Sequence, residues 1–190
     1  INNIISHSKF YKDIFWDKYF SDKHALKIIN RMEQYTNLGD ELVSDIQNAC
    51  TVNEAYQIKE ILFDYDQPAS DHLKFINSGT IDCYKNLWGK KKTQYIKQSY
   101  NNPCVEKKRL QQISDIRLKQ STSKKLIIAN MTTNLECFYD VDGEYLAGKS
   151  TVIISPGKKK INLGVISAFL NSAVTSFYVN HCFNSLKMSG

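Results

Sequence analysis

The sequence lacks the cysteine and apolar patterns of disulfide-stapled, zinc-bound or membrane-spanning proteins. Its five cysteines are odd in number, widely spaced and without a C-x-x-C pair, at positions 50, 83, 104, 137 and 182. Disulfide frameworks and structural zinc sites need paired spacing, so we expect reduced thiols, no metal site and a cytoplasmic protein. No run approaches the roughly 18 apolar residues of a membrane span, and the N-terminal "INNIISHSKFYKD" lacks the regions of a signal peptide.

Catalytic motifs are equally scarce. The three prolines are Pro68, Pro103 and Pro156, and none stands in an Asn/Asp-Pro-Pro-aromatic loop, which amino-methyltransferases use to hold a flipped base. No G-x-G is present for a methyl-donor or dinucleotide loop, and no Ser/His/Asp or Cys/His set is suggested by local sequence. We therefore predict no catalytic residues and no cofactor on this chain.

One enzyme alternative stays open at this stage. A metal-dependent nuclease needs an acidic metal ligand and an acid-x-Lys pair, and Asp82 with Glu106 and Lys108 fits that pattern loosely. Glu106 stands among Lys107, Lys108 and Arg109, where a charged helix face explains the residues as well. Metal-dependent cleavage would favour the nuclease.

A phosphate-loop pattern, Gly143-x-x-x-x-Gly148-Lys149-Ser150, is present in "DGEYLAGKST". Such a loop follows a buried strand and opens a helix, whose N-terminus holds the phosphates. Here the next residues, "TVIISP", are β-branched and end at a proline, which predicts a strand. The preceding "LECFYDVDGEYL" predicts a hairpin with an Asp-Gly turn, so we expect no nucleotide binding.

Charge is distributed unevenly along the 190 residues, whose net charge is +6. Residues 1–72 contain 7 Lys and Arg against 12 Asp and Glu, whereas residues 73–190 contain 18 against 7. The second part therefore favours a polyanionic partner and the first part a different role. A solvated lysine surface is the plainer explanation of the same excess.

Hydrophobic periodicity predicts an α+β fold in which strands and helices are segregated. Residues 8–37 are helical in pattern, with Ser21 as one N-cap, and form a linker or, alternatively, a protein-binding module through helices 8–36. A strand is expected within 41–50, and Thr51 and Glu54 have capping-box spacing before a helix at 53–62. The remaining expectations are a strand in "LKFINSGTI", a helix over 106–120, strands in "KKLIIANMT", "LECFYD" and "STVIIS", and a helical C-terminal region in which Leu163, Ile166, Phe169 and Leu170 face the core.

The stretch 82–104 interleaves aromatic residues with lysines. Lysines neutralise phosphates and aromatic rings stack on bases, so Tyr84 and the lysines of this stretch are candidate nucleic-acid contacts. An ordinary loop whose aromatic residues anchor it is the alternative, and we expect Trp88 to be such an anchor. The candidates for backbone positioning are Lys85, Lys90, Lys91, Lys92 and Lys149, and those for reading base edges are Asn77, Thr80, Asp82 and Gln94.

Several segments in order, "KFINSGTIDCYKNLWG", "QYIK", "ISDIRLKQ", "KKLIIANMT", "DGEYLAGKSTVIISP" and "FLNSAVTSFYVNHCFNSL", resemble one family. It is the TaqI-like C-terminal specificity domain of type IIG restriction–modification enzymes and related adenine-N6 DNA methyltransferases. The sequence departs from the family pattern at Cys83, where a basic residue is common, and at Asn130, where glycine is usual.

The resemblance implies a mixed or antiparallel sheet with packed helices that recognises double-stranded DNA. Methylation with S-adenosylmethionine, and Mg²⁺-dependent cleavage where it occurs, would take place on other domains of the same polypeptide. We accordingly expect residues 1–37 to be a helical linker from an upstream methyltransferase domain. Residues 38–190 would be the DNA target recognition domain, shortened at its C-terminus.

Overall fold

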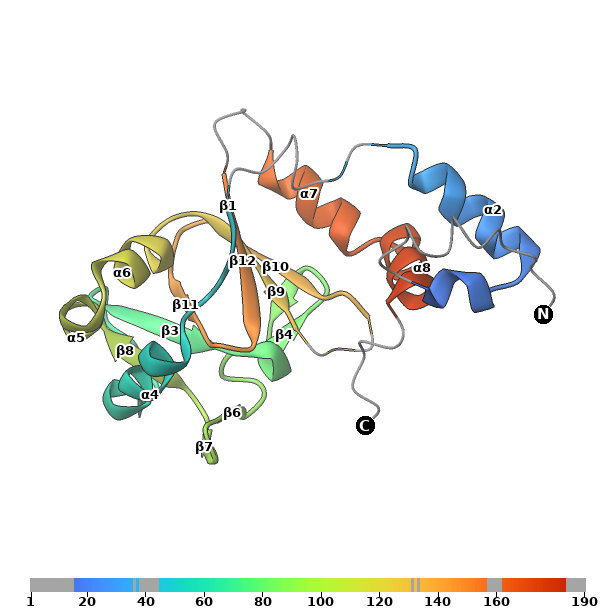
Figure 1. Cartoon of the computed structure of the whole chain (residues 1–190). Helices are drawn as coiled ribbons and strands as arrows, with labels where there is room; N and C mark the ends of the chain where they lie inside the picture. Colours follow the sequence, from blue (N-terminus) through green and yellow to red (C-terminus); the bar gives the residue numbers. More distant parts are fainter. Residues whose placement is uncertain are drawn as a thin grey trace.

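The first of the two four-stranded sheets in the computed structural model is fully antiparallel. The structure describes residues 16–35, 37, 45–130, 132, 134–156 and 162–183. Within them, two four-stranded sheets with packed helices confirm the predicted α+β class (Figure 1). The order in this sheet is β1-β12-β9-β10, with β1 (Asp45–Asn48), β12 (Thr151–Ser155), β9 (Lys125–Ala129) and β10 (Cys137–Asp140).

Strand β9 lies between β12 and β10, and both of its faces are covered. All five of its residues are buried, and successive side chains point to opposite sides of a strand. Leu126 and Ile128 pack with helix α7 (Leu163–Leu170). Ile127 packs into a second cluster that also contains Ile76 of the other sheet. The apolar residues of β9 therefore join helix α7 on one side to the second sheet on the other.

The second sheet is mixed and corrects one expectation. Its order is β11-β3-β8-β2, with β11 (Tyr145–Ala147), β3 (His72–Ile76), β8 (Pro103–Glu106) and β2 (Phe63–Asp64). The predicted strands on either side of Asp142-Gly143 are present, but the predicted hairpin pairing between them is wrong. Strand β10 pairs with β9, whereas β11 crosses to the second sheet and pairs in parallel with β3.

Asp140 directs this crossing between the sheets. Its buried carboxylate accepts the backbone N–H groups of Gly143, Glu144 and Tyr145 at 3.0–3.1 Å and forms an ion pair with buried Lys125. Gly143 has φ +69°, and a Cβ there would lie 2.4 Å from the backbone of Thr122, so glycine is required. The turn after β10 is thus held by the Asp140 carboxylate, which accepts three hydrogen bonds from the backbone.

Helices α4 (Val52–Ile61), α5 (Lys107–Ile113) and α6 (Asp115–Ser121) lie beside the second sheet (Figure 1). The capping box of Thr51 and Glu54 is present, as predicted. The helix expected over 106–120 is divided at Ser114, whose hydroxyl accepts the N–H of Arg117 and begins α6. The Arg117 guanidinium then pairs with Glu54 at 3.1 Å, which ties α6 to α4.

A helical region combines the two ends of the described chain. The 3-10 helix η1 (Asp17–Phe20) and α2 (Lys23–Met32) lie near α7 and α8 (Ala173–Cys182) in Figure 1. Glu33, which follows α2, pairs with Lys18 at 2.8 Å and accepts the Tyr178 hydroxyl of α8 at 3.3 Å. Because the predicted linker binds the C-terminal helix, its described part is a packed element of the fold. Residues 1–15 and 36 of that prediction lie outside the described residues.

The start of α2 corrects a second expectation. Asp22, and not Ser21, is the N-cap, because its carboxylate accepts the N–H groups of both His24 and Ala25.

Among the described helices, none is long and apolar enough to cross a membrane alone; α7 and α8 together meet those criteria by length and composition, with a bend of 57° between them.

Two short hairpins complete the described elements. After β3 the chain forms the 3-10 turn η2 (Ser78–Thr80) and then the hairpin of β4 (Ile81–Asp82) and β5 (Lys85–Asn86). A second hairpin consists of β6 (Thr93–Tyr95) and β7 (Gln98–Tyr100). The segment with Lys90, Lys91 and Lys92, called the lysine loop below, lies between these hairpins, so most of the candidate contacts fall within one short part of the chain.

Candidate nucleic-acid interface

A polar junction brings distant candidate residues together. The Ser150 hydroxyl donates to Asn77 Oδ1, and the Ser78 hydroxyl donates to the Ser150 carbonyl. Asn77 Nδ2 in turn donates to the backbone carbonyl of Gln94 at 3.2 Å. Three segments, the end of β3, strand β6 and the connection before β12, therefore meet at one place. Lys149 stands on the last of them and is exposed.

Gly148 is part of this junction, which explains the phosphate-loop pattern. A Cβ at Gly148 would lie 2.6 Å from Asn77 Oδ1 and 2.9 Å from the Phe75 ring. The glycine is thus needed for close packing against β3, and strand β12 follows Ser150 directly. The strand expected after the motif is confirmed.

Thr80 does not fit the role that the sequence suggested. Its side chain is fully buried, and its hydroxyl accepts the Asn77 N–H at 3.1 Å and donates to the Asn77 carbonyl at 3.0 Å. No surface of Thr80 is left for a base edge in this conformation. Its contacts instead hold the backbone of Asn77, so we assign it a positioning role.

The β4–β5 hairpin pairs two of the predicted contacts with each other. Asp82 Oδ2 lies 3.2 Å from Lys85 Nζ, and Asp82 Oδ1 accepts the Cys83 N–H at 2.8 Å. That backbone hydrogen bond, followed by the Lys85 ammonium, holds the pKa of Asp82 below its ordinary value. Tyr84 occupies the turn with φ +64° and is exposed. The hairpin therefore offers an aromatic ring beside a charge pair.

The lysine loop is anchored at one end and exposed at the other. Trp88 is half-buried and donates its indole N–H to the Pro103 carbonyl at 2.8 Å, which confirms the predicted anchor. The N–H groups of Lys90 and Lys91 both donate to the Leu87 carbonyl, which closes a tight turn. The side chains of Lys90, Lys91 and Lys92 are exposed, and none forms an ion pair with a described residue. The Lys91 ammonium also acts on the nearby carboxylates of Asp82 and Glu136, but all three exposed charges can neutralise phosphates.

A shallow hollow lies beside the lysine loop. Burial raises the pKa of Glu136 in this hollow, and the neighbouring Asp82 carboxylate acts in the same direction. Carboxylates accept hydrogen bonds from exocyclic base amino groups, so Glu136 joins Asp82 as a group of that chemistry. Glu136 is not among the residues predicted from the sequence; its signal is an acid inside the largely apolar "LECFYD". The hollow is lined by Ser78, Gly79, Ile81, Asp82, Leu87, Lys91, Thr132, Asn134 and Glu136.

The structure gives the nuclease alternative no support. Asp82 is on the β4–β5 hairpin, whereas Glu106 ends β8 of the second sheet and lies opposite His72. Over the residues described here, no group of three or more His, Cys, Asp and Glu side chains is arranged to hold a metal ion.

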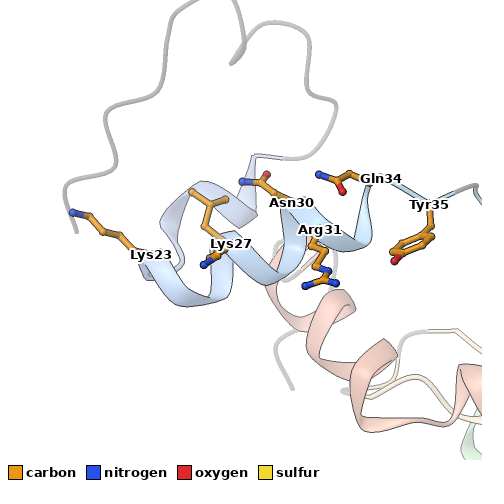
Figure 2. Close-up of a pocket in the computed structure, with 7 residues that line it drawn as sticks. Lys23, Lys27, Asn30, Arg31, Gln34 and Tyr35 are labelled. Carbon is orange, nitrogen blue, oxygen red and sulfur yellow. The ribbon is translucent and has the colours of Figure 1, made fainter.

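The outer side of α2 presents a separate set of cations. Figure 2 shows Lys23, Lys27 and Arg31 along this helix, with Asn30, Gln34 and Tyr35 around the same shallow hollow. Ile29 and Ala25 are buried on the inner side. The protein-docking alternative for this region remains a prediction. Lys23, Lys27 and Arg31 equal the lysine loop in charge and serve as its control in the binding experiment below.

The fold is an α+β domain in which exposed lysines lie beside a polar junction of three segments. The chain belongs to the family of TaqI-like C-terminal specificity domains, whose model matches residues 73–189. The match covers more than half of the chain and includes every candidate contact. A comparison with curated proteins found no match. The domain boundary predicted at residue 38 lies upstream of the match and stays a prediction.

Proposed function

We propose that this chain recognises a specific sequence in double-stranded DNA for a type IIG-like restriction–modification enzyme. Adenine-N6 methylation, cleavage or both would be carried out by other domains of the same polypeptide. The observation that supports this function best is the Trp88-anchored loop with three exposed, unpaired lysines beside the junction of Asn77, Gln94 and Ser150. The loop would hold phosphates, and the junction would fix the side chains that face the bases.

The cofactors of such an enzyme would be held outside this chain. S-adenosylmethionine supplies the methyl group and Mg²⁺ assists cleavage, but the residues here do not suit either. The sequence contains no G-x-G loop, and of the two carboxylates in the hollow, Asp82 and Glu136, the first is paired with Lys85. The enzyme would act in the cytoplasm, where its DNA lies.

Replacement of Lys90, Lys91 and Lys92 by Ala tests this proposal. We expect specific and nonspecific duplexes to lose affinity about equally, because lysine is a point charge with little base discrimination. The slope of log affinity against log salt should fall by up to about three, roughly one for each lost phosphate contact. The measurement is competition binding against a randomised duplex library at two salt concentrations.

The matched control removes the same charge from another surface. Lys23, Lys27 and Arg31 are also exposed, and their replacement by Ala should leave the salt slope of DNA binding unchanged. A flat salt response in the parent chain would contradict the electrostatic basis of the proposal. An equal effect of both triple variants would show that only net charge matters and that the lysine loop is no specific site.

A further inference from the structure

The β6–β7 hairpin is a ribbon with one buried and one exposed face. Thr93 and Tyr100 lie opposite each other, and both are buried. Gln94 and Ser99 also lie opposite each other, but both are exposed, and Gln94 Nε2 donates to Ser99 Oγ at 3.0 Å. The ribbon thus presents a polar pair to solvent from a firmly attached base.

Aromatic side chains attach this ribbon to the core. Tyr95 is 4% exposed, packs on Phe75 with ring centroids 4.6 Å apart and donates its hydroxyl to the Ala55 carbonyl. Burial is the main reason that the pKa of Tyr95 lies well above its ordinary range, so this hydroxyl remains protonated and can donate. A side chain carried by such a base keeps its position, which base reading requires.

The turn of the hairpin is strained and is not built from ordinary turn residues. Ile96 has φ +41° and Lys97 has φ +63°, whereas two-residue turns of this kind normally use Asn-Gly or Asp-Gly. A β-branched residue in this region is a genuine outlier. Ile96 packs against the core cluster, which compensates for the strain. The result places Lys97 at the tip and Gln98 directly after it, at the start of β7 and opposite Tyr95, and both Lys97 and Gln98 are exposed.

Gln98 differs from Gln94 in one decisive respect. The Gln94 amide is engaged by Ser99, whereas no described residue hydrogen-bonds the Gln98 side chain. A free amide on a rigid ribbon can form the bidentate pair that Gln makes with adenine. The major groove is wide enough to admit a two-stranded ribbon. Lys92 of the loop directly precedes Thr93, so a phosphate-binding segment leads into the ribbon, which projects from the domain in Figure 1.

We propose that the β6–β7 hairpin enters the major groove of the target duplex, where Gln98 reads a base edge and Lys97 contacts a phosphate. The inference rests on the proposed DNA recognition and adds Gln98, which the sequence pattern does not single out, as a base contact. Gln98 pairs with Tyr95, so Gln94 and Ser99 would lie on the other side of the ribbon and flank the base contact from there. The strained turn would hold Gln98 toward the floor of the groove.

Two single variants separate the two roles. Gln98→Ala should reduce preference at one base pair by about 5- to 150-fold and leave nonspecific affinity and the salt slope unchanged. Lys97→Ala should lower the salt slope by about one and keep the preference. Gln57→Ala, an exposed glutamine on α4, is the matched control and should change neither quantity. The measurement is competition binding of each variant against a randomised duplex library.

The groove is tested with duplexes that carry 7-deazapurine, which lacks the major-groove N7 acceptor. At the base pair assigned to Gln98, this change removes one of the two hydrogen bonds to the base, so it should weaken the preference of the parent chain and have no effect on Gln98→Ala. If the parent chain discriminates sequences but Gln98→Ala retains every preference, the hairpin inference fails and DNA recognition stands. If the deaza duplex is bound with full preference, the hairpin does not read the major groove. If the parent chain shows no sequence preference, DNA recognition itself fails.

Discussion

Lys125 and the lysines of residues 90–92 have the same chemistry, but the fold places them at opposite extremes of exposure. Lys125 is 1% exposed, pairs with Asp140 and donates to the carbonyls of Ser121 and Ser123. Burial lowers the pKa of Lys125, and the Asp140 carboxylate opposes that effect. Lys90, by contrast, is exposed and has no ion pair among the described residues. The first lysine supports a turn between sheets, and the second is available to a partner.

The difference shows why net charge alone does not locate the interface. The excess of 11 positive charges in residues 73–190 counts both kinds of lysine equally. Lys125 contributes nothing to the outer surface, and Lys85 and Lys74 are paired with Asp82 and Glu144. The exposed lysines without an ion pair, and not the total charge, are therefore the ones to which the proposed DNA contacts are assigned.

Replacement of Asp140 by Ala should give the largest effect on stability. It removes the partner of buried Lys125 and leaves three backbone N–H groups without their acceptor. Loss of one partner of a buried ion pair typically costs roughly 3–5 kcal/mol of unfolding free energy. The exposed neighbour Asp142 is the control, and Asp142→Ala should stay within about 0.5 kcal/mol of the parent chain. Urea unfolding measures both; equal losses would contradict the comparison.

Local patterns in the sequence were sufficient for most of the elements. The strands β9 and β12 follow from β-branched runs, β10 follows from its aromatic residues, and the capping box at Thr51 and Glu54 follows from its spacing. The anchoring role of Trp88 also agrees with the prediction. These features depend on residues that are close together in the chain, so periodicity and turn chemistry contain the necessary information.

Long-range pairing could not be predicted in the same way. Strand β11 joins β3, about 70 residues earlier, because the Asp140 carboxylate turns the chain out of the first sheet. A period-two pattern cannot tell a hairpin from such a crossing. The same limit explains Thr80, which is polar but buried, and Phe169, which was expected to face the core but is 52% exposed. Whether a side chain is exposed depends on which other segments of the fold pack over it.

The ion pair of Glu54 and Arg117 is intermediate in exposure between buried Lys125 and exposed Lys90, and it predicts that the stability of the fold depends on pH. Burial by itself raises the pKa of Glu54, but the Thr51 N–H and the Arg117 guanidinium outweigh it and hold that pKa below 4.5. A carboxyl group with a lowered folded-state pKa stabilises the fold above its unfolded value, and that contribution is lost as pH falls through the folded value. The melting temperature should therefore fall on acidification below about pH 4.5, and less steeply in Glu54→Gln.

Glu60→Gln, on the exposed side of the same helix, is the control for this measurement. Its melting temperature should follow that of the parent chain throughout the acid range. Identical acid profiles for the parent chain and Glu54→Gln would show that the pair of Glu54 and Arg117 contributes no pH-dependent stability.

Lys149→Ala should produce the smallest effect and separates DNA binding from nucleotide binding. Lys149 is a single exposed lysine beside the polar junction, so its loss should lower the salt slope of DNA binding by about one. Stability should change by less than about 0.5 kcal/mol, as for other exposed positions. Because strand β12 and not a helix follows Ser150, ATP and GTP have no helix N-terminus to bind, and equilibrium dialysis with Mg²⁺ should detect no binding. Saturable micromolar nucleotide binding that Lys149→Ala abolishes would reverse the assignment and make Gly143–Ser150 a phosphate site after all.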